Sequence, residues 1–107
     1  MPANYPMPLN APSTTLSVTA TSARILLSSG SNNFVVLKNI GDNPVFLVAG
    51  DATVTATFPT AGTFTDGTIL ASGEITTYSK DYLHSYVAYI CAAGLSSTVV
   101  IQVGQGV

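Results

Sequence analysis

Apolar and polar residues alternate along several short stretches of this chain, and each stretch ends in a cluster of turn-forming residues. In residues 15–20 (TLSVTA) every second position, beginning with Leu16, is apolar. Residues 52–58 (ATVTATF) repeat the pattern, with their apolar residues opposite threonines. A period of two is typical of a strand with one face buried. The second stretch follows a Gly-Asp pair, so we predict that it forms a hairpin with residues 44–49.

Further strand signals come from runs rich in β-branched and aromatic residues. These runs are residues 23–28, 34–39, 44–49, 68–70, 74–79, 84–93 and 98–103. Turn signals recur every eight to twelve residues and hardly any stretch shows a helical period, which favours antiparallel sheets over parallel βαβ units. We therefore predict an all-β fold, an antiparallel β-sandwich or jelly roll of about eight strands, over residues 14–107. The pattern leaves the strand order open.

Two of the predicted strands are apolar on both faces. In residues 34–37 and again in residues 86–90, positions that point to opposite faces are all apolar. A two-sheet sandwich buries one face of each sheet, so the second face needs a cover. We expect a second subunit or another partner to supply it, because monomers rarely expose large apolar patches. The alternative is that central strands are apolar throughout.

The first thirteen residues are predicted to form an extended arm, separate from the β-body. Its opening, MPANYPMPLNAP, holds four prolines in twelve residues, which excludes a helix and a central strand. In an extended chain Tyr5, Met7 and Leu9 keep their N–H donors on one edge, while the prolines between them remove donors from the other. We expect these three residues to bind a partner by pairing along that edge. The alternatives are a polyproline II helix, which lacks such edges, and a tail with no partner.

Charged residues are scarce. They make up 7% of the chain, against about 25% in ordinary soluble domains, and the net charge is −2. The three basic residues are scattered, which argues against nucleic-acid binding because that requires clustered Lys or Arg. No apolar run approaches the ~20 residues that span a bilayer, and no secretory signal is recognisable, so we expect synthesis in a cytoplasm and no membrane partner. A neutral, easily desolvated surface and the two-faced strands together favour a homo-oligomer.

Residues able to carry chemistry are few and scattered. His84 is the only histidine, and its nearest carboxylate in the sequence, Asp81, lies three residues away. Cys91 is the only cysteine, so no internal disulfide is possible, and it belongs to the apolar run YVAYIC. No serine lies in a nucleophile motif, and a metal site needs three or four converging ligands. We predict no enzyme activity, no catalytic or metal site and no cofactor.

Phe64, in the loop sequence GTFTDGT, joins the three apolar arm residues as a candidate partner-binding residue. An aromatic side chain in the middle of a loop can anchor a partner. The alternative is that Phe64 packs beneath its own loop against Phe58. The threonines of residues 52–58 form a row on one strand face, which suits either glycan binding or an ordinary neutral surface.

Residues 39–57 and 69–79 resemble stretches of small virion proteins of tailed bacteriophages. The shared pattern is a turn with an Asn-Pro pair, a strand that ends in Gly-Asp, and a later Gly-Glu pair before another strand. The matching residues are Asn43, Pro44, Gly50, Asp51, Gly73 and Glu74. The resemblance implies a capsid decoration, or cement, protein that bridges coat proteins on the outside of a phage head. It further implies the virion capsid surface as location, the major capsid protein as partner, and self-association as a trimer.

Two alternatives from other functional classes stay open. A phage tail or fibre component, or a carbohydrate- or receptor-binding module, would use exposed aromatic and polar residues around a groove. The chain has no tryptophan for stacking on glycans, which weakens this alternative. A small hydrolase would need a catalytic site that the sequence lacks. We therefore expect a structural virion protein.

Overall fold

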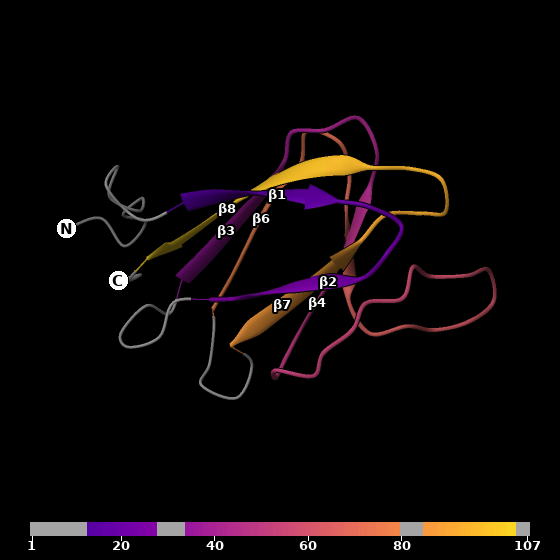
Figure 1. Cartoon of the computed structure of the whole chain (residues 1–107), viewed down its shortest axis with the longest axis horizontal. Helices are drawn as coiled ribbons and strands as arrows, with labels where there is room; N and C mark the ends of the chain where they lie inside the picture. The colour runs from indigo at the N-terminus through magenta and orange to yellow at the C-terminus, as the bar shows by residue number, and fades with distance from the viewer. Residues whose placement is uncertain (1–12, 28–33, 80–84, 105–107) are drawn as a thin grey trace.

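The structure, a computed structural model, describes residues 13–27, 34–79 and 85–104, which fold into eight strands without a helix (Figure 1). The strands are β1 (Ser13–Val18), β2 (Ala23–Leu26), β3 (Phe34–Asn39), β4 (Val45–Gly50), β5 (Thr68–Leu70), β6 (Ile75–Ser79), β7 (Tyr86–Ile90) and β8 (Ser97–Gly104). They form two antiparallel sheets: sheet 1, in the order β1-β8-β3-β6, and sheet 2, in the order β2-β7-β4-β5. The predicted all-β fold of about eight strands is confirmed. Across the described residues, no helix has the length and hydropathy needed to cross a membrane.

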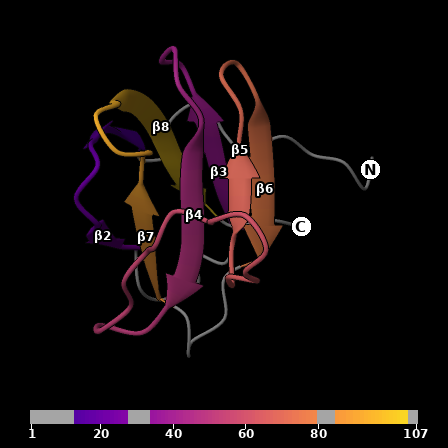
Figure 2. The ribbon, with the colours of Figure 1, turned by 90° about the vertical axis from the view of Figure 1, so that its right-hand side faces the viewer.

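The strand order is that of a jelly roll. β1 pairs with β8, β2 with β7, β3 with β6 and β4 with β5, so the pairs are nested like those of one long hairpin. Rolling up that hairpin brings β8 beside β3 and β7 beside β4, which completes both sheets. Two sides of the sandwich stay open: one lies between the edge strands β1 and β2, the other between the edge strands β5 and β6. Figure 2 shows the second of these sides.

The main core lies between the two sheets, and alternation in the sequence selects its side chains. In β1, Leu16 and Val18 are buried while Thr15 and Ser17 are exposed, as predicted for this stretch. The buried core residues are Leu16, Val18, Leu27, Val35, Leu37, Val45, Leu47, Leu70, Val87, Tyr89, Cys91, Val99 and Ile101. Each large aliphatic side chain among them contributes about 1.5–3 kcal/mol by leaving water. Burial of these positions therefore decides which face of each strand turns inward.

A second hydrophobic cluster lies on the outer face of sheet 2, where residues 51–58 cover Phe46, Ala88 and Ile90. The prediction that residues 52–58 form a hairpin strand is wrong. Their alternate apolar side chains do share one direction, toward the sheet, but the backbone makes no ladder with another strand. A period of two reports which side chains share a face, and it holds for any extended segment whether or not its backbone is paired.

Hydrogen bonds fasten this covering segment to the rest of the chain. Ser22 Oγ accepts a hydrogen bond from the Ala56 backbone N–H at 2.8 Å, and Arg24 donates to a carbonyl oxygen of the segment at 3.4 Å. At its start Asp51 Oδ1 accepts from the backbone N–H and the hydroxyl of Thr53, at 2.9 and 2.6 Å, which is an Asx turn. The expectation that a second subunit covers the outer face of β7 is therefore wrong, because the chain itself covers it.

The outer face of sheet 1 has a different character. Among the residues whose side chains the structure describes, the outward ones are Ser13, Thr15, Ser17, Val36, Lys38, Ile75, Thr77, Thr98, Val100 and Gln102, as the strand registers place them. Lys38 is the one charged residue in this set. No hydrophobic cluster of the described residues forms over this face of sheet 1. Hydroxyl groups keep this face compatible with water although charge is nearly absent.

A buried asparagine joins the turns at one end of the sandwich. Asn39, at the end of β3, is fully buried and donates through Nδ2 to the carbonyl oxygens of Asn43 and Leu70, at 2.8 and 3.0 Å. Its Oδ1 accepts from the Gly41 N–H at 3.0 Å and from the Ser97 hydroxyl at 2.8 Å. These four bonds use the full donor capacity of the amide and two acceptor positions, so the group is buried without an unsatisfied donor.

Candidate interaction sites

The described residues bring together no catalytic constellation. Within the described ranges, no three His, Cys, Asp or Glu side chains lie close enough to hold one metal ion. His84 and Asp81 fall outside these ranges. Cys91 is buried between the sheets, and this burial raises the pKa of its thiol, so the group is protonated and shielded from a partner. The absence of enzyme activity stays a prediction. The candidate interaction sites on the described surface are apolar.

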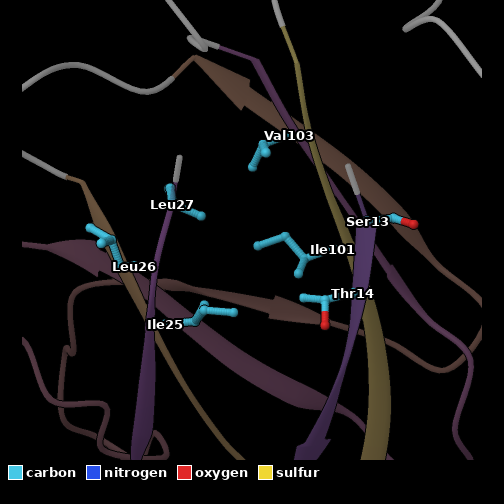
Figure 3. A pocket seen from close by; sticks show the side chains of 7 residues that line it. All are labelled: Ser13, Thr14, Ile25, Leu26, Leu27, Ile101 and Val103. Atoms are coloured by element: carbon cyan, nitrogen blue, oxygen red, sulfur yellow. The ribbon is translucent and has the colours of Figure 1, made fainter. Parts of the chain in front are cut away.

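At the open side between β1 and β2, the core ends in an apolar trough of about 150 Å³ (Figure 3). Its lining residues are Ser13, Thr14, Ile25, Leu26, Leu27, Ile101 and Val103, and none of them is charged. Figure 3 shows Leu27, directly after β2, and Ile101 and Val103, from β8, turned toward the same space. The trough is suited to aliphatic or aromatic side chains, because it presents hydrocarbon and few polar groups.

The trough exists because the inward row of β1 loses its apolar character at the start of the strand. Thr14 occupies the inward position two residues before the buried Leu16, and it is exposed. Ile25 and Val103 pack against the core and stay half-buried. The two sheets are therefore separated here by a gap that no described side chain fills. An apolar side chain that bound in this gap would extend the core.

Both strands that border the trough have a free edge. In the described part of the chain, β1 has a neighbour only in β8, and β2 only in β7. A free edge presents unpaired backbone N–H and C=O groups to any extended segment. Such a segment would direct every second side chain toward the trough, as in β-augmentation.

The three predicted arm residues, Tyr5, Met7 and Leu9, lie outside the described residues, and their role stays a prediction. The chain that carries them enters β1 at Ser13, which lines the trough. Sequence reasoning missed the trough itself. Residues 23–28 indicated a strand, but no local signal shows that this strand and β1 belong to different sheets and meet at one open side.

A larger apolar slot, of about 320 Å³, lies on the opposite open side, between β5 and β6. Its lining residues are Leu37, Leu47, Val48, Ala49, Asp66, Gly67, Thr68, Thr76 and Val87. The slot exists because β5 pairs only with residues 45–47 of β4 and leaves the second half of β4 without a neighbour on that side. Core side chains of both sheets, such as Leu37 and Val87, form its floor, and polar groups lie at its rim.

Phe64, the fourth predicted partner-binding residue, projects into solvent with a relative exposure of 105%. The alternative that it packs against Phe58 is wrong, because the Phe58 ring packs edge-on against Phe46 with 6.3 Å between the ring centroids. The threonines at positions 53, 55 and 57 are all exposed, and Thr53 is engaged by Asp51. Phe64 is thus a fully exposed aromatic residue two positions from Asp66, which lines the slot.

Comparison with known proteins finds little similarity. No protein-family model and no curated protein matches the chain. A solved structure from Bacillus endospore appendages, described as a novel family of disulfide-linked pili, has 16% sequence identity and a TM-score of 0.49. The match covers 88% of this chain and 82% of that chain.

The comparison gives the predicted function no support. The similar structure is a pilus of endospore appendages and not a capsid decoration protein, so the predicted decoration function is not retained. The alternative, a tail, fibre or carbohydrate-binding module, does not fit the match either. What stands is the fold, a β-sandwich of two four-stranded antiparallel sheets.

Turn chemistry explains why the resemblance to virion proteins carries little functional information. Gly73 has a φ of +80° in the turn that leads into β6, a conformation that favours glycine. The Glu74 carboxylate closes the same turn by accepting from the Ala71 N–H at 2.7 Å. Asn43 donates from Nδ2 to the Ser96 carbonyl oxygen at 2.8 Å. These are structural roles that any antiparallel β protein can use.

Proposed function

We propose that this chain is a structural subunit that works by self-association, with the trough between β1 and β2 as the acceptor for an extended segment of a second copy. The observation that carries the proposal is the uncharged, apolar trough between two free strand edges. A site of this shape offers backbone hydrogen bonds along its border and hydrophobic contacts at its floor. It has the two parts of a strand-acceptor site and needs no catalytic residue.

The segment that fits this acceptor is the part of the predicted arm that precedes β1, residues 1–12. In an extended conformation Tyr5, Met7 and Leu9 share one face, so all three would point into the trough together. The same three residues keep their N–H donors on one edge, while the prolines block pairing on the other edge. One pairing edge and one apolar face are what a trough with a strand edge beside it requires. The arm, like the trough, carries no charged side chain to desolvate.

A second copy is the favoured source of the arm. An arm that leaves β1 at Ser13 must reverse its direction between Leu9 and Ser13 to reach its own trough, whereas the arm of another copy needs no such turn. Burying the three apolar side chains contributes about 1.5–3 kcal/mol each, against about 1–2 kcal/mol of backbone entropy for each residue ordered. Backbone pairing must therefore add to the hydrophobic term, and the arm alone is expected to bind weakly and reversibly.

The test uses the full chain and light scattering over a range of concentrations. The variant Tyr5→Ser/Met7→Ser/Leu9→Ser removes the apolar face of the arm. The control Ala3→Ser/Asn4→Ser/Asn10→Ser changes three other arm residues and leaves the apolar face intact. We expect the wild-type and control chains to associate more strongly, and into larger assemblies, than the first variant, with unchanged circular dichroism. Equal association of the two variants, or a wild-type chain that stays monomeric at every concentration, would overturn the proposal.

A further inference from the structure

The loop that carries Phe64 reaches the slot between β5 and β6 at Asp66, and the ring and the slot have complementary character. The ring is fully exposed, so it is accessible to a partner that offers an apolar pocket. The slot is lined by hydrocarbon from Leu37, Leu47 and Val87. Its volume of about 320 Å³ lies within the range of about 300–1,000 Å³ that holds small organic ligands, so a phenyl ring fits.

We propose that Phe64 of one copy inserts into the slot of a second copy, and that the exchange is reciprocal about a two-fold axis. A two-fold interface requires one patch that is complementary to itself. This patch satisfies the condition because Asp66 and Gly67, which line the slot, directly follow the loop tip that carries Phe64. Each pair of copies buries two rings and fills two slots.

The occupant is a second copy because the chain leaves its own ring outside its own slot. Phe64 is only two residues from the slot border, yet its side chain makes no ring contact with another described residue and is open to solvent. Gly67, at the slot border, has a φ of +130°, and an added Cβ would meet the ring of Phe46 and the Leu47 carbonyl oxygen. The loop is therefore held at its base, while the Phe64 side chain is open to solvent.

Charge at the patch is compatible with this contact. Asp66 is the one charged residue among those that line the slot, and it is exposed at the rim, so it keeps its water when the floor is filled. The remaining polar groups of the rim are the hydroxyls of Thr68 and Thr76. An apolar centre with a hydrated polar rim is the usual anatomy of a protein interface.

This contact is independent of the proposed docking of the arm, since it lies on the opposite open side of the sandwich. The two contacts together would give each copy two association surfaces, one at each open side. An arm contact that passes from copy to copy, combined with a two-fold contact at the other side, would build an extended assembly rather than a closed pair.

The experiment uses the lack of tryptophan in this chain, which makes Phe64→Trp a unique fluorescent reporter. It is carried out in the full chain with the Tyr5→Ser/Met7→Ser/Leu9→Ser arm, so that association through the trough does not contribute. We expect the tryptophan emission to shift to shorter wavelength as the concentration rises, in parallel with dimer formation by light scattering. Emission of a solvent-exposed indole at every concentration would contradict the inference, whatever the arm does.

Two further variants locate the contact. Ala49→Leu places a larger side chain in the slot and is expected to abolish the shift. Ala61→Leu makes the same change at an exposed position of the loop that does not line the slot, and is expected to preserve the shift. In a mixture, a chain with Phe64→Trp and Ala49→Leu has a ring and no slot, and a chain with Phe64→Ser has a slot and no ring. We expect this mixture to recover the shift, and a mixture without recovery would count against ring exchange.

Discussion

The two outer faces of the sandwich are built from similar strands, but only one of them is covered by other described residues. On sheet 2 the residues 51–58 lie over Phe46, Ala88 and Ile90 and form a third layer. On sheet 1 the outward residues are mainly Ser, Thr and Val, and no hydrophobic cluster of the described residues forms over them. Described residues cover the face with large apolar groups and leave the face with hydroxyl groups open, as expected from the free energies of transferring these groups out of water.

The length of one connection makes the difference possible. Residues 51 through 67, seventeen in all, separate β4 from β5, although these strands are hydrogen-bonded neighbours. Loops longer than about 12–15 residues without secondary structure are uncommon unless they have a task. The first half of this connection covers sheet 2, and the second half presents Phe64. A long loop between adjacent strands is thus a sign of added function rather than of distance to be bridged.

The largest loss of stability is expected from removing the side chain of sheet 2 against which residues 51–58 pack. Phe46→Ala leaves a cavity between sheet 2 and residues 51–58 and is expected to reduce the free energy of unfolding by about 3–5 kcal/mol. Val100→Thr, on the open face, is expected to change it by no more than about 0.5 kcal/mol. Urea unfolding followed by circular dichroism measures both. Similar losses in the two variants would mean that the two faces do not differ in packing.

A smaller loss of stability is expected from a substitution within the covering segment, residues 51–58. Phe58 is half-buried and meets Phe46 edge-on, so Phe58→Ala removes one packed ring and one aromatic pair, or about 1–3 kcal/mol. Hydrogen exchange should become faster in residues 51–58 and stay unchanged in β3 and β8. Phe64→Ala, the matched control, removes an exposed ring and is expected to leave stability unchanged in the monomer. Faster exchange throughout the protein would show that the cover is not a separate layer.

Removing a single hydrogen bond between residues 51–58 and the rest of the sandwich is expected to lower stability by less. Ser22→Ala removes the acceptor for the Ala56 N–H, which we expect to lower stability by about 0.5–1.5 kcal/mol. The Ala56 amide should lose protection from hydrogen exchange. Ser17→Ala, on the open face, is the control and should have no measurable effect. Unchanged hydrogen exchange of the Ala56 amide in the Ser22→Ala variant would argue against this hydrogen bond.

Two groups buried between the sheets should make the stability of the protein depend on pH in the alkaline range. Burial raises the pKa of the Cys91 thiol and of the Tyr89 hydroxyl, so both groups ionise more readily in the unfolded chain than in the folded one. Their contribution to stability is complete below the ordinary pKa values and declines as the pH rises through and above them. Urea midpoints measured upward from neutral pH should therefore fall. In Cys91→Ala, the part of that decline that begins near the ordinary thiol pKa should be absent, and an identical pH profile would contradict this assignment.

Much of the strand content could be read from the sequence. Alternation of Leu16 and Val18 with Thr15 and Ser17 predicts both the first strand and its buried face, because side chains in an extended chain point alternately to opposite faces. The same local rule fails for residues 52–58, where the facing is right and the pairing is wrong. Phe64 stood out as a candidate because of its loop position, and it is exposed. These results depend on neighbours in the sequence.

The nested pairing that makes the jelly roll was decided by tertiary structure alone, and so were the trough and the slot. Ser13 and Gln102 are neighbours across β1 and β8 although almost the whole chain separates them. Thr14, Ile25 and Ile101 line one trough from three strands and two sheets. Local sequence determines which residues are extended and which side is apolar. Which strands become neighbours, and where the core is left open, depends on contacts summed over the whole fold, which no short stretch contains.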